Sequence, residues 1–355
     1  MRGVSETVQG DELRLMPQNV EGGKVTAEWH SKASYPPQVS IVVVSYTIER
    51  ISEMISLIES IEQENHNDLE LVLVVERDSD LFNMVLAHLR NSSLRIQAIF
   101  SDKRIGISGA RNLGTEHCSS GIVSFVDDDA RLSKGWKRTL INDFENNSQI
   151  LGVVGRVDPS FERQEDTWFP KAFYWMIGCS GWTSWASKRL TRFGWGANMS
   201  FKSDVFTKFQ FEEGFSEGAG KSGKIGPVGD DTDFCFRITA KGGRLLFDPN
   251  LLVHHKVYSY RVSPQFTRRY AFWQGYTEGR FQHRLRAFDS RKSQQTRYVG
   301  LLLGSLIPDI FSKISSGNRM WRSELALLID STIFMGLGFV SFYSERMLSV
   351  CSNLL

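Results

Sequence analysis

The chain has 355 residues, of which 41% are hydrophobic and 12% aromatic, and 42 basic residues oppose 40 acidic ones for a net charge of +2. This composition supports a packed core and excludes a disordered chain, and the balanced charge excludes a nucleic-acid-binding protein, which usually carries a basic excess. The 4 cysteines are scattered and form no CxxC pair, so neither a disulfide framework nor a zinc site is expected and a reducing, cytoplasmic setting fits best.

Residues 1–38 are polar and lack periodicity, and no apolar signal-peptide region follows Met1. We interpret this stretch as a tail or an edge extension. From residue 39 onward, apolar runs with strand character alternate with helical spacing: strand 39–46, helix 51–61, strand 69–75, helix 81–89, strand 94–100, helix 109–118 and strand 122–126. The alternation predicts an α/β fold with a Rossmann-like, mostly parallel sheet flanked by helices. Ligands of such sheets bind beyond the carboxyl ends of the strands.

Three consecutive aspartates, Asp127, Asp128 and Asp129, directly follow the predicted strand 122–126. Adjacent carboxylates at a strand end repel one another, and a bridging divalent cation lowers that cost. Mg²⁺ or Mn²⁺ held by carboxylates and substrate phosphates is the usual chemistry. A solvated acidic turn is the alternative, and we favour the metal site.

A glycine-containing turn leads into the helix predicted at 109–118, and Arg111 lies in its first turn. Glycine and alanine there allow close approach of the backbone, and the arginine offers a fork of donors to a phosphate or carboxyl group. An ordinary turn into a helix is equally consistent with this pattern.

A second acidic cluster, around Asp230 and Asp231, precedes a short apolar helix at 234–238. Either residue could cap that helix, and either could act as a general base at the helix start. The adjacent His254 and His255 follow a short strand, so they point to opposite faces and at most one faces the site. A neutral imidazole there could complete a metal site.

Two other features are less specific. Residues 211–229 form a glycine-rich loop, either a lid or a plain surface loop; its segment 218–222 resembles a phosphate-binding loop, but Phe215 stands where glycine is required. Five of the 9 tryptophans gather within 168–195 and could line a pocket for a sugar or lipid, sit at a membrane interface, or pack in the core: Trp168, Trp175, Trp182, Trp185 and Trp195.

Together and in this order, these features resemble the GT-A fold glycosyltransferases of family 2, over about residues 39–280. The carriers of the resemblance are the strand at 40–46, the Gly-Ala-Arg-Asn-Leu-Gly segment at 109–114, the aspartates at 127–129, Gly-Ala-Asn-Met at 196–199, and the aspartates at 230–231. The resemblance implies inverting transfer of a sugar from a nucleotide diphosphate-sugar to a hydroxyl or phosphate acceptor, with Mn²⁺ or Mg²⁺ as cofactor.

The resemblance also assigns roles on the donor side. Ser45, Tyr46 and Glu76 match the positions that contact the nucleotide base, and aspartate is more usual at the position of Glu76, so the base stays open. Arg111 belongs to the donor-binding segment. Asp127 and Asp129 match the outer residues of the DxD motif and are metal-ligand candidates, Asp129 foremost, with Asp128 between them on the donor side.

On the acceptor side, Asp231 matches the catalytic base, and Asp230 replaces the glutamate common before it. His255, ahead of His254, matches a histidine that faces the metal and diphosphate, and is a third ligand candidate. The acceptor-side candidates are Trp182, Trp195, Asn198 and Asp230.

The end of the chain differs from the rest. A helix is predicted from Pro264, and it begins a basic stretch containing Arg268, Arg269, Arg280, Arg284, Arg286, Arg291, Lys292 and Arg297. Two apolar segments follow: 298–307 is too short to span a bilayer, and 325–343 just reaches the required length but contains Asp330. They are either helices lying in or re-entering a membrane beside a basic surface, which we favour, or a helical hairpin packed on the globular core.

We therefore expect a polar extension at 1–38, a GT-A catalytic domain at 39–260 and a C-terminal helical, membrane-associated region at 261–355. This suits a polyprenyl-phosphate-linked acceptor at the cytoplasmic face of a membrane, as in similar enzymes. Two other functions compete. A nucleotidyltransferase would release pyrophosphate and have no use for Asp231, and a non-catalytic membrane-bound scaffold would have no need of Asp127, Asp129 and Asp231 together.

Overall fold

The computed structural model describes residues 7–8, 11–15, 25–31, 36–64, 68–90, 92–183, 185–213, 226–285, 304 and 306–352. The predictions for the loop segment 218–222, for most of the apolar segment 298–307 and for the basic residues from Arg286 to Arg297 lie outside them. The chain divides into two compact units that interleave along the sequence. The first comprises Met1–Asp158, Ala186–Gly214 and Asp230–Lys256, and the second Pro159–Trp185, Phe215–Gly229 and Val257–Leu355.

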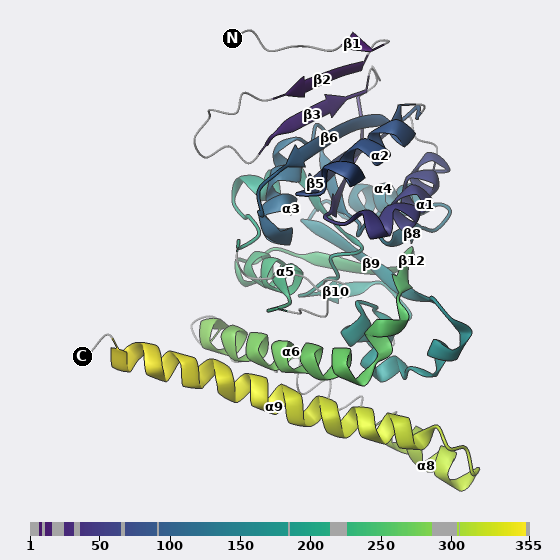
Figure 1. The fold of residues 1–355 in the computed structure, drawn as a ribbon, viewed down its shortest axis with the longest axis vertical. Helices are drawn as coiled ribbons and strands as arrows, with labels where there is room; N and C mark the ends of the chain where they lie inside the picture. Colours follow the sequence, from purple (N-terminus) through teal and green to yellow (C-terminus); the bar gives the residue numbers. More distant parts are fainter. Residues whose placement is uncertain are drawn as a thin grey trace. The chain divides into compact units, whose positions relative to one another are not determined.

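Parallel strands form the centre of the sheet in the first unit, in the order β6-β5-β4-β7, of which β5 and β6 are labelled in Figure 1. They are β4 (Val39–Ser45), β5 (Leu69–Glu76), β6 (Arg95–Ser101) and β7 (Ile122–Phe125). The helices that connect them are α1 (Ile51–Glu62), α2 (Ser79–Leu89) and α3 (Gly106–Glu116). Every residue of β5 is buried, as expected for a parallel strand covered on both faces. These predicted strands and helices are confirmed, with shifts of a few residues at their ends.

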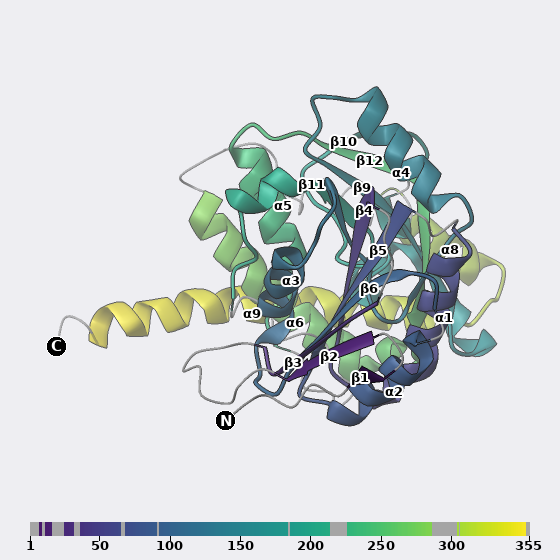
Figure 2. The same cartoon turned by 90° about the horizontal axis from the view of Figure 1, so that it is seen from above.

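Antiparallel strands extend the sheet on both sides of this centre (Figure 2). Beyond β6 come β3 (Ala27–His30), β2 (Asp11–Leu15) and β1 (Thr7–Val8), so the described part of the first 38 residues forms an edge extension. Beyond β7 come β11 (Met199–Lys202), β9 (Gly152–Phe161), β12 (Leu245–Val257) and β10 (Arg189–Thr191), and β8 (Ala130–Leu132) also pairs with β12. Among the segments that connect these strands are α4 (Trp136–Asn146), α5 (Asp230–Ala240) and the 3-10 turn η6 (Ser203–Thr207). A further 3-10 turn, η1 (Ile48–Arg50), lies between β4 and α1.

A phenylalanine cluster packs α5 against the sheet. Phe234 of α5 stacks on Phe211, with ring centroids 4.2 Å apart, and meets Phe201 of β11 edge-on at 5.1 Å. Phe211 also meets Phe125 of β7 edge-on at 5.1 Å. Because aromatic pairs of this geometry add to the energy of area burial, they fix the start of α5 relative to the end of β7. The three aspartates 127–129 come just after β7, and Asp230 and Asp231 begin α5.

The second unit is helical. Its elements are η3 (Gln164–Trp168), η4 (Lys171–Ile177), η5 (Gly181–Thr183), η7 (Ser259–Val262), α6 (Pro264–Leu285), α8 (Ile307–Ser315) and α9 (Trp321–Ser352). The helix predicted from Pro264 is confirmed as α6, and α9 contains the predicted apolar segment 325–343. Among the described residues, one helical stretch is long and apolar enough, by length and composition, to cross a membrane: Trp321–Glu345. Of the 18 most apolar consecutive residues in this stretch, 22% are buried.

Helices α6 and α9 lie side by side, with their backbones in close contact (Figure 1). A methyl group on Gly275 of α6 would approach the carbonyl carbon of Met335 to 2.7 Å, and one on Gly338 of α9 would approach that of Phe272 equally closely. Small residues at such contacts allow helices to approach as they do in membrane proteins. This contact gives a packing reason for the glycine at both positions.

Candidate active site

The three aspartates after β7 contact three separate parts of the first unit. Asp127 Oδ1 lies 3.4 Å from Nη2 of Arg111 on α3. Asp128 Oδ1 accepts a hydrogen bond of 2.7 Å from Nη1 of Arg50, at the end of η1. Asp129 Oδ1 lies 3.0 Å from Nε2 of His255 on β12. Two arginines and a histidine, from three segments of the chain, therefore contact the three carboxylates.

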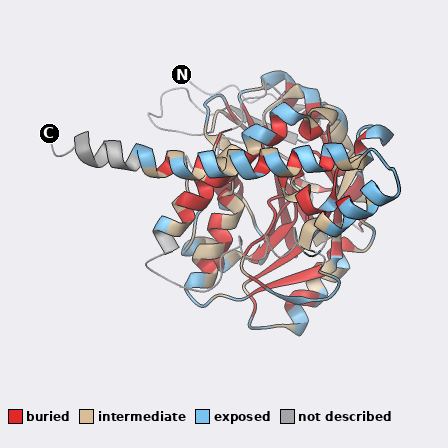
Figure 3. Ribbon diagram, turned by 90° about the horizontal axis from the view of Figure 1, so that it is seen from below, coloured by how far each residue is buried: buried red, intermediate tan, exposed pale blue. Residues whose placement is uncertain are grey.

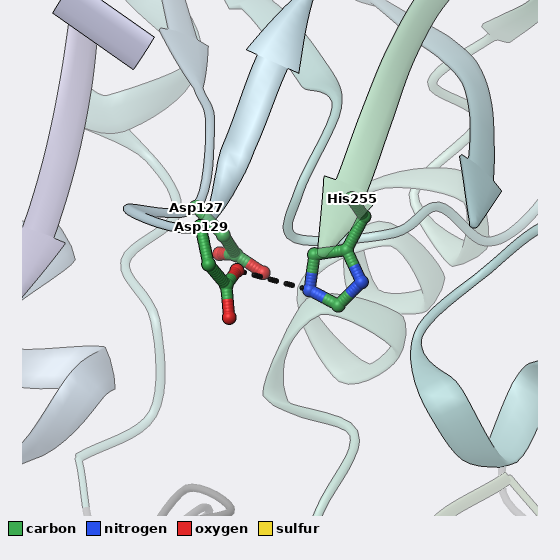
Figure 4. A group of neighbouring side chains, drawn as sticks. All are labelled: Asp127, Asp129 and His255. Carbon is green, nitrogen blue, oxygen red and sulfur yellow. Dashed lines mark ion pairs between the residues drawn. The ribbon is translucent and has the colours of Figure 1, made fainter. Parts of the chain in front are cut away.

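Asp127, Asp129 and His255 form a group that could hold a metal ion, since one ligand atom from each lies within 4.8 Å of the others (Figure 4). The pairing of β8 with β12 assembles the group, because it sets His255 opposite Ala130. Lys256 N also donates to the backbone oxygen of Asp129 over 2.8 Å. His254 is the half-buried neighbour and does not belong to the group. Carboxylate oxygens suit Mg²⁺ and Mn²⁺, and an imidazole nitrogen suits transition metals.

Arg111 connects this group to the second acidic cluster. Its guanidinium is buried, and besides Asp127 it donates through Nη1 to Asp230 Oδ2. Burial lowers the pKa of Arg111, but the charges of Asp230, Asp127 and Asp231 outweigh it and raise the pKa. A methyl group on Gly196 would lie 3.0 Å from Cζ of Arg111 and closer still to Nη2, so the guanidinium needs glycine at this position.

Asp231 is oriented by backbone N–H groups. Gly196 N donates to its Oδ2 over 2.8 Å, and Thr232 N donates to its Oδ1 over 2.6 Å. Burial, followed by the charge of Asp230, raises the pKa of Asp231 to about 6, although Arg111 and the two N–H groups act in the opposite direction. A carboxyl group with this pKa is mostly ionised at neutral pH and can accept a proton. Helix α5 begins at Asp230, so both aspartates belong to its first turn.

Three predicted donor-binding side chains make their contacts within the protein instead. Ser45 is fully buried and its hydroxyl donates to Asp128 Oδ2 over 2.5 Å, which adds to the bond that Asp128 accepts from Arg50. Glu76 is buried, and its Oε2 accepts from the N–H groups of Ile105 and Gly106 at the start of α3. Ser45, Asp128 and Glu76 therefore support the turn and the helix that carry the site, and their contacts with a donor stay predictions.

Two predicted acceptor-side residues are also internal. Asn198 has no exposed surface; it accepts from Trp136 Nε1 over 3.0 Å and donates to the backbone oxygens of Leu251 and Arg156. Because its amide groups bond within the fold, the expectation that Asn198 meets the acceptor does not fit. Trp195 is 8% exposed and packs edge-on against Phe193 and Phe247, so it serves the core.

Of the remaining predicted residues, two are half-buried and one is paired with an arginine. Tyr46 is half-buried and lies beneath the guanidinium of Arg50, whose Cζ is 5.5 Å from the ring centroid. Trp182 is half-buried in η5 of the second unit. Asp230, also an acceptor-side candidate, pairs with Arg111.

Sequence reasoning missed Arg50. It is 6% exposed, and Nη1 contacts both Asp128 at 2.7 Å and Asp129 Oδ2 at 3.3 Å. Burial lowers the pKa of Arg50, but Asp128 and Asp129 outweigh it and hold the pKa well above its usual range. The signal that could have found Arg50 is its place just after the first buried strand, at the same carboxyl edge as the aspartates.

Comparison with known proteins identifies the family. The model of glycosyl transferase family 2 matches residues 40–212. The glucosyl-dolichyl phosphate glucuronosyltransferase of Haloferax volcanii is 30% identical over 242 residues, which are 68% of this chain and 76% of that relative. The chain is a family 2 glycosyltransferase.

A further relative matches a shorter stretch, and a solved structure shares the fold. The GalNAc(5)-diNAcBac-PP-undecaprenol β-1,3-glucosyltransferase of Campylobacter jejuni is 28% identical over 106 residues, 30% of this chain and 34% of that protein. A solved structure of a mannosyltransferase from Pyrobaculum calidifontis, in complex with GDP-Man and Mn²⁺, has a TM-score of 0.53 at 15% identity, with 85% of this chain and 87% of that chain covered. The structural likeness confirms the predicted GT-A fold of the family 2 glycosyltransferase.

Proposed function

We propose that this glycosyltransferase moves a sugar from a nucleotide diphosphate-sugar to a polyprenyl-phosphate-linked acceptor, with inversion and with a divalent metal ion. One observation carries the proposal: Arg111 contacts both Asp127, of the candidate metal group, and Asp230, next to Asp231. A single guanidinium thus links a group suited to a metal with a carboxylate suited to proton transfer.

The donor side is supported by the candidate metal group and by the structural neighbour that binds GDP-Man and Mn²⁺. Asp127, Asp129 and His255 would hold the ion. When bound, Mn²⁺ or Mg²⁺ would neutralise the charge that develops on the leaving diphosphate, so no protein acid is needed. Arg111 orients Asp127 through its ion pair and keeps a positive charge between the two acidic clusters.

Asp231 would accept the proton of the acceptor hydroxyl. Its two backbone N–H donors fix the carboxylate in place, and a pKa of about 6 leaves it ionised at neutral pH yet basic enough to take up a proton. One base and a single displacement at the anomeric carbon give inversion, by the logic that applies to inverting glycosidases.

Two relatives support a lipid-linked acceptor, because their names include dolichyl phosphate and PP-undecaprenol. The outward side of α9 also supports a membrane surface as partner (Figure 3). Its exposed apolar residues recur every three or four positions, which places them on one face: Leu325, Ile329, Ile333, Leu337 and Val340.

The acidic residues of α9 have partners on α6 and α8. Glu324 is 1% exposed and pairs with Lys313 of α8, and Asp330 pairs with Arg268 of α6 over 2.8 Å. A helix with its apolar side outward and its acidic residues paired inward fits a lipid surface better than water. We therefore propose that the enzyme works at a membrane, on its cytoplasmic face, with the α9 face against lipid.

The test is direct transfer by the purified full-length protein. UDP-, GDP- and dTDP-sugars are offered in turn with a polyprenyl phosphate or its glycosylated form, with Mn²⁺ or with EDTA, and the released nucleotide is identified. Release of a nucleoside diphosphate, only with metal and acceptor, supports the proposal. Release of pyrophosphate from a nucleoside triphosphate and a sugar phosphate would replace it with the nucleotidyltransferase function.

A further inference from the structure

Arg50 contacts the aspartates of the site but belongs neither to the metal group nor to the proton-accepting carboxylate. It lies where η1 ends and α1 begins, and its backbone N–H donates to Thr47 O over 3.3 Å. The turn before it is tied to the start of α2, because Ile48 N donates to Asp78 Oδ2 over 2.8 Å and Asp78 Oδ1 accepts from Leu81 N. The arginine therefore projects from a rigid segment.

The guanidinium contacts two adjacent aspartates with one nitrogen. Nη1 lies 2.7 Å from Asp128 Oδ1 and 3.3 Å from Asp129 Oδ2. Ser45 contacts the other oxygen of Asp128 at 2.5 Å, and His255 contacts the other oxygen of Asp129 at 3.0 Å. The two oxygens of each carboxylate thus have different neighbours, so rotation of either carboxylate would lose a contact.

We propose that Arg50 is a positioning residue for metal binding. It anchors Asp128 and one oxygen of Asp129, and thereby keeps the other oxygen of Asp129 beside His255. This inference rests on the proposed metal role of Asp127, Asp129 and His255. It adds that Arg50 holds Asp129 beside His255 before donor or metal arrives.

Two effects of Arg50 on a cation have opposite signs, and this makes the proposal testable. A guanidinium next to a metal site repels the cation, so its removal should tighten metal binding if charge dominates. Partners that orient metal ligands strengthen binding, and their removal typically weakens metal affinity by roughly 10- to 100-fold. Positioning therefore predicts weaker binding after Arg50 is removed.

The experiment is a Mn²⁺ titration of the full-length protein without donor, in which the EPR signal of free Mn²⁺ reports binding and thermal unfolding reports the fold. For Arg50→Met we expect a dissociation constant roughly 10- to 100-fold higher than that of the wild type. Arg50→Lys, which restores a positive charge without the planar fork, should recover part of the loss. Ser45→Ala, a milder change that removes only the hydroxyl bond to Asp128, should weaken binding in the same direction by a smaller factor.

Arg95→Met is the matched control, since Arg95 Nε makes a similar ion pair of 2.9 Å with the buried Glu70 at the other end of β5. It should lower the melting temperature without changing the Mn²⁺ affinity. Unchanged or tighter Mn²⁺ binding by both Arg50→Met and Ser45→Ala, in folded protein, overturns the role of Arg50. Failure of the wild type to bind Mn²⁺ overturns this inference together with the proposed metal group.

Discussion

Replacing Gly196 by alanine tests the link between Arg111 and Asp231 without changing any chemical group of the site. The added methyl would lie 3.0 Å from Cζ and 3.3 Å from Nη1 of Arg111, and closer still to Nη2. Ordinary van der Waals contact begins near 3.4 Å, so the guanidinium must move or the turn that carries Gly196 must retreat. Either movement acts on contacts that are already at their limit, because Nη2 lies 3.4 Å from Asp127 Oδ1.

The expected cost of Gly196→Ala follows from these distances. Overpacking of a tight contact costs about 1–3 kcal/mol of folding free energy. A misplacement of about 1 Å at a reacting group can cost ~100-fold in rate. Since Gly196 N also donates to Asp231 Oδ2, we expect kcat to fall by about two orders of magnitude while the protein stays folded.

The assay is release of nucleoside diphosphate under saturating donor and acceptor, with thermal unfolding measured in parallel. Gly121→Ala is the control, because a methyl group there would meet nothing within 4 Å. It should leave both the rate and the melting temperature near those of the wild type. Full kcat in Gly196→Ala would show that Arg111 and Asp231 need no such packing, and would refute the reasoning.

Three further predictions concern the base, the metal and the membrane. Asp231→Asn should still bind the donor in calorimetry, but its kcat should fall on the order of 10²–10⁴-fold. Because the raised pKa of Asp231 is about 6, the activity of the wild type should rise as the pH increases through 6 and level off above 7. A flat activity profile between pH 5 and 8 would contradict the role of Asp231. Asp129→Ala should abolish the rise in melting temperature that Mn²⁺ and donor produce together, and an unchanged rise would count against this ligand. The double variant Ile329→Lys/Ile333→Lys changes two side chains of α9 that are 50% and 53% exposed, and it should reduce flotation with anionic vesicles. The control Asn142→Lys, at an exposed position of α4, should not. Equal flotation of the wild type, the double variant and the control would exclude the α9 face as the contact.

Local patterns in the sequence were sufficient for the parallel centre of the sheet. The β-branched run of β4 and the helical spacing in α1 each carry their own signal, because burial on both faces or on one face repeats with a fixed period. The start of α5 at Asp230 was harder to place, since aspartate fits the cap position and the first turn equally well.

The partners within the site were beyond such patterns. The contact between Asp129 and His255 depends on the pairing of β8 with β12, strands more than a hundred residues apart, and no local residue signals that register. The burial of Arg50 and Asn198 could not be predicted either, because both side chains are polar. Only hydrogen bonds to residues distant in the sequence offset the cost of burying them. The family resemblance suggested where ligands bind, but it could not distinguish side chains that face a ligand from those that support the turn.

The distribution of three successive carboxylates among three distant basic residues has a consequence for how the enzyme is made. The partners of Asp127, Asp128 and Asp129 are Arg111, Arg50 and His255, so two come earlier in the chain and the last comes much later. A chain that stops before β12 has Arg50 and Arg111 available but lacks the imidazole and the strand that pairs with β8. During synthesis, the two arginines can therefore pair with the acidic turn early, while the proposed metal group is complete only once the C-terminal part of the sheet has formed. Truncated or nascent chains should neither bind Mn²⁺ nor compete for donor.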